Sequence, residues 1–176
     1  MNLLKRITYK GLFGADKNIE NNRELRKSVR VVFLDAQNLA AVLYVAKVNF
    51  YTLPGGGVDE GETIEQAAVR EILEETGCDG EILAEIGMIE KEPMEDNWMP
   101  GISYCYLAKL AGEKGVQKLT EREADEDTQV QWHDLHEVLR LIENQNVCDI
   151  WGKFIQARDS IIVNEAIKIL GEQSKH

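Results

Sequence analysis

Apolar residues recur along the chain with two different periods, which predicts a mixture of strands and helices. Short runs rich in β-branched and aromatic residues, bounded by glycine, proline or polar turns, are typical of strands. They predict strands at 29–35, 39–46, 50–53, 81–90, 102–110 and 130–132. Longer stretches with an apolar residue every three or four positions predict helices at 64–76, after Asp134, and at 149–170. This order of elements indicates one α/β domain.

The helix predicted at 64–76 has a clear start and a clear end. Thr63 is a favourable N-cap, and Gln66 three residues later completes a capping box. Gly77 stands where a left-handed residue is needed to end the helix. Each residue turns a helix by about 100°, so one stripe carries small or apolar residues first and carboxylates last. The stripe consists of Ile64, Ala67, Ala68, Glu71 and Glu75, with Glu74 beside it.

The carboxylates of Glu71, Glu74 and Glu75 lie at the C-terminal end of this helix, where the helix dipole is negative. Like charges four residues apart oppose a helix by about 0.2–0.5 kcal/mol per pair. A solvated acidic face is the plain interpretation in a chain this acidic. Divalent cations such as Mg²⁺ or Mn²⁺ prefer oxygen ligands and would offset both costs. The cluster is therefore a candidate metal site.

Two further helices are predicted near the C-terminus. Asp134 and Glu137 have the spacing of a capping box and open the first of them. The second, at 149–170, directs four apolar residues toward a core: Trp151, Phe154, Ile155 and Ile162.

The first 27 residues leave three alternatives open, namely a short strand, an extended arm or a partly mobile segment. No internal repeat or low-complexity segment divides the remainder. We therefore expect an arm or strand at 1–27 and the main domain at 28–176.

Composition narrows the class of protein. A chain of 176 residues with 44% hydrophobic and 29% charged residues is typical of one soluble globular domain. No apolar run approaches the roughly 20 residues of a membrane helix, and no signal-peptide pattern follows Lys5 and Arg6. Cys78, Cys105 and Cys148 lack CxxC spacing and are expected to be reduced thiols. These features predict a cytoplasmic protein without a membrane partner.

The net charge of −11 argues against nucleic acid as a partner, because nucleic-acid binding needs a basic patch. It does not argue against a small nucleotide, since metal ions can carry the phosphates. The net charge therefore leaves a small nucleotide open as a partner while arguing against general nucleic-acid binding.

The segment 56–78 carries the most specific pattern in the chain. It reads GGVDEGETIEQAAVREILEETGC and follows the spacing G-x5-E-x7-R-E-U-x-E-E-x-G-U, where U is a bulky apolar residue. This pattern resembles the Nudix box. The chain matches it at Gly56, Glu62, Arg70, Glu71, Ile72, Glu74, Glu75 and Gly77, while Cys78 replaces the final bulky residue. The resemblance is tight over these 23 residues and looser beyond them.

The resemblance implies a Nudix hydrolase domain, built as an α/β/α sandwich with a mixed β-sheet between helices. It implies hydrolysis of a pyrophosphate bond in a nucleoside diphosphate linked to another group, with Mg²⁺ or Mn²⁺ as cofactor. By the same resemblance Glu71, Glu74 and Glu75 are metal ligands. Arg70 pairs with a glutamate and fixes its orientation, and Glu62 orients the turn or supports the site electrostatically.

The general base varies between members of the Nudix family. It is either a glutamate of the box or an acid in a downstream loop. Glu71 is the candidate within the box. The polar segment 112–127 is a predicted loop with four alternatives: Glu121, Glu123, Asp125 and Glu126. We favour Glu71, because the loop acids reach the cleft only if the loop folds back.

The sequence determines the substrate least. Gly56 allows the backbone to approach a phosphate or a metal closely. Tyr51, Trp98 and Tyr104 are candidates to stack on a base, although aromatic side chains more often serve packing. We expect an ordinary or oxidised nucleoside triphosphate of the MutT type, with ADP-ribose or a dinucleoside polyphosphate as alternatives.

A module that binds a nucleotide without turnover is a further alternative. Such modules usually lose one or more box carboxylates, and this chain keeps them all. We therefore favour the enzyme. A homodimer is common in the family and is expected here on that ground alone.

Overall fold

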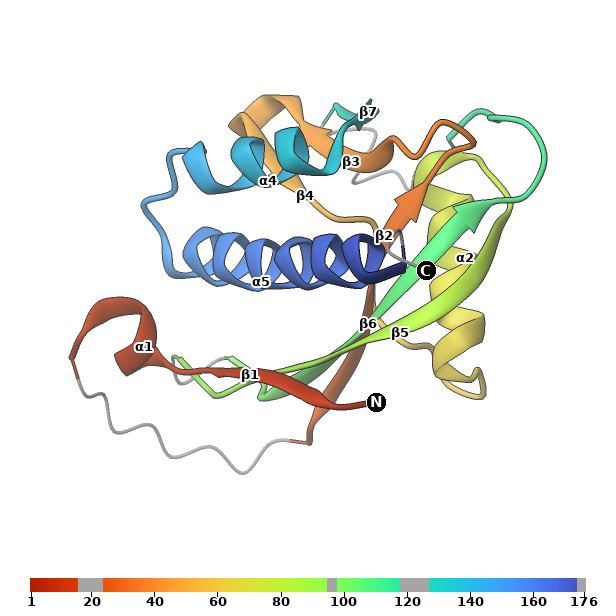
Figure 1. The fold of residues 1–176 in the computed structure, drawn as a ribbon. Helices are drawn as coiled ribbons and strands as arrows, with labels where there is room; N and C mark the ends of the chain where they lie inside the picture. Colours follow the sequence, from red (N-terminus) through yellow and green to blue (C-terminus); the bar gives the residue numbers. More distant parts are fainter. Residues whose placement is uncertain (16–23, 95–97, 118–126, 174–176) are drawn as a thin grey trace.

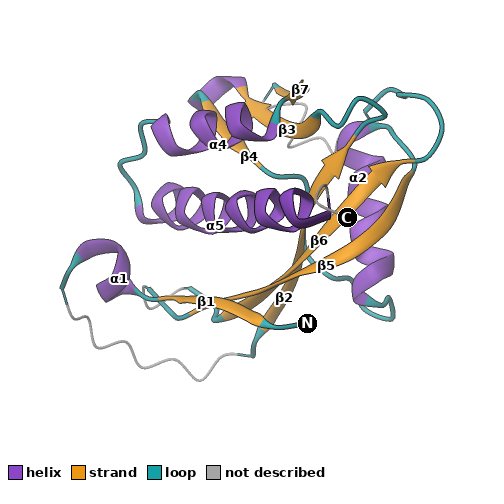
Figure 2. Cartoon of the chain, viewed as in Figure 1, coloured by secondary structure: helices purple, strands orange, loops and turns teal. Residues whose placement is uncertain are grey.

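The chain folds into a mixed β-sheet with helices against both of its faces (Figures 1 and 2). The computed structural model describes residues 1–15, 24–94, 98–117 and 127–173, and within these ranges the sheet has seven strands. The strands are β1 (Leu3–Ile7), β2 (Arg26–Leu34), β3 (Ala40–Val45), β4 (Phe50–Thr52), β5 (Gly80–Lys91), β6 (Gly101–Leu110) and β7 (Thr128–His133). The helices are α1 (Tyr9–Phe13), α2 (Ile64–Thr76), α4 (Leu135–Asn144) and α5 (Ile150–Gln173), with a short 3-10 turn η1 (Ala46–Val48) after β3. The predicted α/β architecture is confirmed.

The sheet combines parallel and antiparallel pairs in the order β1-β5-β6-β2-β3-β4, and β7 pairs with β3 outside this path. β2 and β6 run parallel over nine residue pairs, from Arg26 with Gly101 to Leu34 with Lys109. β2 and β3, in contrast, share a single antiparallel pair, Leu34 with Ala40. The strands β2 and β3 therefore separate after this one pair. Along the N-terminal half of β2, the chain that follows β4 takes the place of β3.

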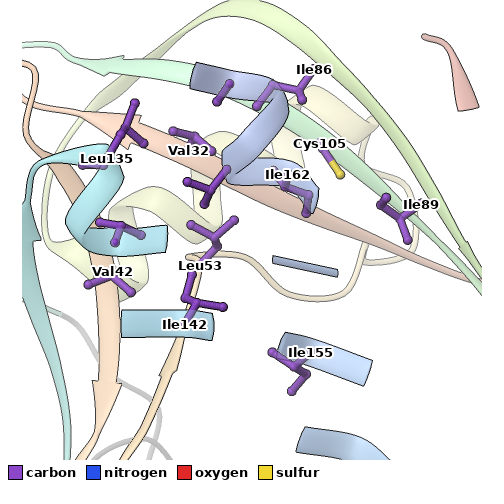
Figure 3. Close-up of a cluster of buried hydrophobic side chains, with 14 of the residues drawn as sticks. Val32, Val42, Leu53, Ile86, Ile89, Cys105, Leu135, Ile142, Ile155 and Ile162 are labelled. Carbon is purple, nitrogen blue, oxygen red and sulfur yellow. The ribbon is translucent and has the colours of Figure 1, made fainter. Parts of the chain in front are cut away.

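Two apolar cores hold the layers together, one on each face of the sheet. Side chains alternate along β2, so Val32 faces one core while Val31 and Phe33 face the other. The first core packs against α4 and α5, as the labelled side chains in Figure 3 show. The second packs against α2, where Ile72 is fully buried. The box helix and the long C-terminal helix thus lie on opposite faces of the sheet (Figure 1).

The predicted strands are confirmed, with ends that differ by a few residues. The largest difference is at β2, which begins at Arg26 instead of Val29. Its pairing with β6 continues through Arg26, Lys27 and Ser28, three polar residues that an apolar pattern does not mark as a strand.

Helix α2 begins and ends where the sequence predicts. The hydroxyl of Thr63 accepts from the N–H of Gln66 at 3.2 Å, and the Gln66 side chain accepts from the N–H of Thr63 at 2.8 Å. Gly77 has a φ of 71°, and its N–H donates to the carbonyl of Leu73. The predicted capping box and the glycine stop are both confirmed.

Helix α4 corrects one prediction. Asp134 caps it by accepting a hydrogen bond from the N–H of His136 at 2.8 Å. Glu137 pairs instead with Arg140 on the next turn, so the predicted capping box of Asp134 with Glu137 is wrong. Arg140 offers Glu137 a charged donor, and a hydrogen bond between two charged groups is stronger than one to the neutral N–H of Asp134.

Helix α5 buries Phe154, Ile155 and Ile162 as predicted. Trp151, however, is 44% exposed, so its predicted place in the core is wrong. Trp151 lies in the first turn of α5, at the edge of the layer, where its ring packs edge-on against Trp98 with centroids 5.1 Å apart.

At the N-terminus, Leu3–Ile7 form β1 parallel to β5, and α1 follows. Of the alternatives for the first 27 residues, these five adopt the strand, while 16–23 lie outside the described residues. All three cysteines are free; Cys78 and Cys105 are buried and Cys148 is exposed. Among the helices that the structure describes, none is both long and apolar enough to cross a membrane.

Candidate active site

A glycine turn after β4 extends the sheet along the open edge of β2. The N–H of Val29 donates to the carbonyl of Gly56 at 2.9 Å. Gly55 has a φ of 137°, and a Cβ there would collide with the backbone of Val29. A Cβ on Gly56 would instead overlap the carboxylate of Glu71. The turn needs glycine at the first position for its backbone, and at the second to admit a carboxylate.

Helix α2 brings two of its three clustered carboxylates against this turn. Glu75 accepts the N–H of Gly55 on Oε2 at 2.6 Å. Glu71 and Glu75 are both buried, whereas the Glu74 side chain is 42% exposed. The stripe on α2 therefore changes from apolar to carboxylate where it passes the turn, as the helical spacing predicts.

Arg70 joins the acids of the segment into one network. Its Nη1 donates to Glu71 at 2.8 Å and to Glu74 at 3.1 Å. Its Nη2 donates to Glu62 at 2.8 Å and to the carbonyl of Gly57 at 2.9 Å, and its Nε donates to Glu62 at 3.1 Å. The repulsion expected between the acids is thus offset by one guanidinium, which also ties the turn to the helix.

The network shifts the protonation of its members in opposite directions. Hydrogen bonds from Arg70 hold the pKa of Glu62 below its ordinary value, and those with Glu62 raise the pKa of Arg70. Burial raises the pKa of Glu71, and Arg70 opposes that rise only in part. Glu71 is therefore a stronger base than an ordinary glutamate, held next to the turn.

The donor set suits a hard divalent cation in kind, because Glu71, Glu74 and Glu75 offer carboxylate oxygens. Within the ranges that the structure describes, no three acidic, histidine or cysteine side chains converge as a metal site. Two contacts explain the spread. Arg70 lies between Glu71 and Glu74, and Glu75 turns toward the N–H of Gly55.

A pocket on the other side of the glycine turn was not predicted from the sequence. It lies between the sheet and α5, with Gly56 at its edge. Its charged and aromatic lining, which we call the basic pocket, comprises Arg26, Arg30, Lys91, Trp151, Phe154 and Arg158. One signal was available in the sequence: the alternation Arg26-Lys27-Ser28-Val29-Arg30 in a strand directs Arg26 and Arg30 to the same face.

The three aromatic candidates for base stacking lie in different places. Trp98 packs against Trp151 and Phe154 beside the basic pocket. Tyr51 packs against Tyr44 across β3 and β4, with tilted rings whose centroids are 4.8 Å apart. Tyr104 packs on the core that faces α2. The structure thus brings only Trp98 close to the pocket.

The loop acids Glu121, Glu123, Asp125 and Glu126 lie outside the described residues. The chain on either side of them is anchored near the box helix. Gln117 donates from its side-chain amide to the main-chain carbonyl of Glu75 at 2.6 Å, and accepts from the N–H of Val130 at 3.2 Å. This role of Gln117 was not predicted from the sequence.

Helix α5 fixes the start of the glycine turn from the other face. Asp159 accepts from the hydroxyl of Thr52 at 2.8 Å and from the N–H of Leu53 at 3.0 Å. Its other oxygen lies 2.6 Å from Arg158 Nε, and both charged side chains are buried. The turn is therefore held at one end by α5 and in its middle by α2.

The glycine turn, the Arg70 network and the sandwich together define a domain class, and a family model of that class matches the chain. The model describes the NUDIX domain and matches residues 24–148. This chain belongs to the NUDIX family.

Curated relatives cover part of the chain. A protein of Bacillus subtilis (strain 168) named "Putative 8-oxo-dGTP diphosphatase" is 41% identical over 91 residues, 52% of this chain and 58% of that protein. An RNA pyrophosphohydrolase of Wolbachia pipientis subsp. Culex pipiens (strain wPip) is 35% identical over 99 residues, 54% of this chain and 59% of that protein. The human 8-oxo-dGDP phosphatase NUDT18 is 33% identical over 138 residues, 68% of this chain and 39% of that protein. The chain thus spans less than two thirds of the length of these relatives.

Solved structures support the fold. A NUDIX hydrolase from Nitrosomonas europaea superposes with a TM-score of 0.57 at 16% identity, over 77% of this chain and 89% of that chain. A MutT protein from Methanosarcina mazei Go1 superposes with a TM-score of 0.54 at 16% identity, over 79% of this chain and 95% of that chain. At this identity the likeness establishes the sandwich architecture only.

Proposed function

We propose that this protein hydrolyses a pyrophosphate bond in a nucleoside diphosphate linked to another group. One observation carries the proposal. Arg70 connects Glu62, Glu71 and Glu74 beside a glycine turn whose backbone also contacts Glu75. A stable fold alone does not require three carboxylates around one arginine and a fourth against the adjacent turn. The family membership and the complete box support the same conclusion.

The box residues have separate roles in this proposal. Glu71, Glu74 and Glu75 would hold Mg²⁺ or Mn²⁺, which neutralises the phosphates and lowers the pKa of a water molecule when bound. Arg70 fixes the orientation of Glu71 and Glu74, and it is itself held by Glu62. The glycine turn lets the backbone come close to the phosphates.

Glu71 is the general base in this proposal. It takes the proton of the attacking water as the water oxygen bonds to phosphorus and the bond from phosphorus to the bridging oxygen breaks. Burial favours this role, because it raises the pKa of Glu71 toward the working pH. The loop acids are the alternative, and Glu71 has the advantage of a defined position next to the turn.

An ordinary or oxidised nucleoside triphosphate is the substrate that we propose. The name of the Bacillus subtilis relative supports it, since that name refers to 8-oxo-dGTP, whereas the name of the human relative refers to 8-oxo-dGDP and supports only the oxidised guanine nucleotide. ADP-ribose and dinucleoside polyphosphates are the alternatives within the same chemistry. A homodimer and a cytoplasmic location stay predictions.

The test is a phosphate-release screen with Mg²⁺ over nucleoside triphosphates, ADP-ribose, dinucleoside polyphosphates and nucleotide sugars. We expect turnover of at least one compound, and its loss in EDTA and in Glu75→Gln. Tight nucleotide binding without any turnover would contradict an enzyme and favour a sensing module.

A further inference from the structure

The basic pocket concentrates positive charge in an otherwise acidic protein. Arg26 and Arg30 enter it from β2, Lys91 from the end of β5, and Arg158 from α5. Arg158 is paired with Asp159. In the described part of the chain, the other three have no carboxylate within ion-pairing distance. The described residues thus gather three cations without an ion-pair partner in a chain of net charge −11, and Arg30 among them feels carboxylates only from a distance, those of Asp159, Glu75 and Glu71.

These cations are held together against their own repulsion. Burial and the nearby Arg158 lower the pKa of Arg30 to about 10. The buried Nε of Arg30 has no hydrogen-bond partner among the described residues. Burial also lowers the pKa of Lys91 to about 8, and Arg26, Arg158 and Arg30 add to that effect. Uncompensated charge at a concave site is costly, and an anion at that site removes the cost.

Three aromatic rings surround the Lys91 ammonium, and two of them, those of Trp151 and Phe154, line the pocket. Its Nζ lies 5.0 Å from the ring centroid of Trp98 and 5.4 Å from those of Trp151 and Phe154. Trp151 keeps 44% of its surface exposed. The rings hold the ammonium in place through cation–π attraction without neutralising its charge, so it remains available to an anion.

The pocket begins where the acidic network ends. Gly56 belongs to both, because it lines the pocket while its Cα faces the carboxylate of Glu71. A Cβ on the next residue, Gly57, would lie 3.4 Å from a terminal nitrogen of Arg26. The glycine turn therefore separates a carboxylate site on one side from a cationic site on the other.

We propose that the basic pocket binds a further phosphate of the substrate, adjacent to the two phosphates joined by the scissile bond. Direct contact with cations suits this phosphate, whereas carboxylates can hold a phosphate only through a metal. The substrate class is then a chain of at least three phosphates. A neutral sugar in the same place leaves Arg26 and Lys91 without an anionic partner among the described residues.

Two experiments test this inference. The kinetic experiment rests on the proposed function, whereas the binding experiment does not. Three sources share the chemistry of a third phosphate: a free nucleoside triphosphate, a dinucleoside polyphosphate and an RNA 5′-triphosphate. Hydrolysis of each at matched concentration distinguishes them.

The binding experiment uses calorimetry of the full chain in EDTA with inorganic tripolyphosphate and pyrophosphate. We expect tripolyphosphate to bind more tightly. Arg26→Gln and Lys91→Met should each weaken it about tenfold or more, because a charged hydrogen bond is lost. Lys109→Met is the control: it removes the same charge at an exposed position on β6 and should change affinity less than twofold. If Lys109→Met weakened tripolyphosphate binding as much as Arg26→Gln and Lys91→Met do, the loss would reflect net charge alone, and the proposal would be overturned.

The kinetic experiment compares kcat/KM for a nucleoside triphosphate and for ADP-ribose. Arg26→Gln and Lys91→Met should lower the first about tenfold, mainly through KM, and leave the second nearly unchanged. Equal losses for both substrates, or none, would overturn the pocket while leaving the proposed function intact. Absence of turnover for every substrate would contradict the proposed function, and the binding experiment would still decide the pocket.

Discussion

The Thr52 hydroxyl donates a hydrogen bond to Asp159 at 2.8 Å, and this contact joins β4 to the long helix α5 just before the glycine turn. Asp159 and its ion-pair partner Arg158 are 0% and 2% exposed. The buried Asp159 carboxylate also accepts from the N–H of Leu53, so it holds the turn from the face of the sheet that α5 covers. The position of the turn thus depends on a residue outside the box.

Asp159→Ala should destabilise the protein by about 3–5 kcal/mol, because it leaves Arg158 buried without its partner. Urea unfolding measures the change. Glu90→Gln is the matched control, since it breaks the pair of Glu90 with Arg6, which has the same 2.6 Å length but lies on the surface. If the two variants lowered the free energy of unfolding equally, burial of the Arg158–Asp159 pair would not be the cause of the loss.

Glu75→Gln should lower kcat by about a hundredfold or more while the fold is kept. The amide oxygen can still accept from the N–H of Gly55, so the turn stays in place. Steady-state kinetics at limiting Mg²⁺ gives the loss, and circular dichroism checks the fold. Glu81→Gln, at an exposed position on β5, controls for the change of charge. Near wild-type turnover of Glu75→Gln would remove Glu75 from the metal ligands.

Mg²⁺ at 100 times its Kd should stabilise the native state by about 2.7 kcal/mol, which raises Tm by about 5–10 °C. Replacement of Glu71, Glu74 and Glu75 together by glutamine should abolish this rise. Thermal melts with EDTA as reference provide the measurement. A rise that persists in the triple variant would place the metal elsewhere.

Glu71→Gln should lower kcat by about 10²–10⁴-fold at saturating Mg²⁺, as loss of a general base does. The four loop acids, replaced singly by their amides, serve as the comparison: Glu121, Glu123, Asp125 and Glu126. A hundredfold loss at one of them, together with a loss below tenfold for Glu71→Gln, would move the base to the loop.

Tripolyphosphate affinity should fall as the pH rises through about 8, where Lys91 loses its proton. The sign follows from the charge: the ammonium attracts the anion below its pKa, and the neutral amine does not. Arg26, Arg30 and Arg158 face the same pocket, and the pKa of Arg30, about 10, lies above that of Lys91, so Lys91 loses its proton first. The ratio of wild-type affinity to that of Lys91→Met should therefore decline between pH 7 and 9.5, and the ligand's own ionisation cancels in that ratio. A flat ratio would exclude Lys91 from the anion site.

The box helix could be predicted in full, because Thr63, Gln66 and Gly77 act within one turn of its ends. The proximity of Glu71 and Glu75 also followed from helical spacing alone. The basic pocket could not be predicted, since Lys91 and Arg158 come from elements that only the sheet order and the placement of α5 bring together. Trp151 illustrates the same limit: an apolar stripe does not reveal where a helix passes the edge of its layer.

The parallel pairing of β2 with β6 has a consequence for the order in which the site is built. Arg26 meets Gly101, and Thr52 meets Asp159, so both contacts must close long loops. Helix α2 and its capping residues precede β6 and α5 in the chain. The box is therefore synthesised before the elements that hold the glycine turn in place. The proposed active site should reach its final geometry only when α5 docks.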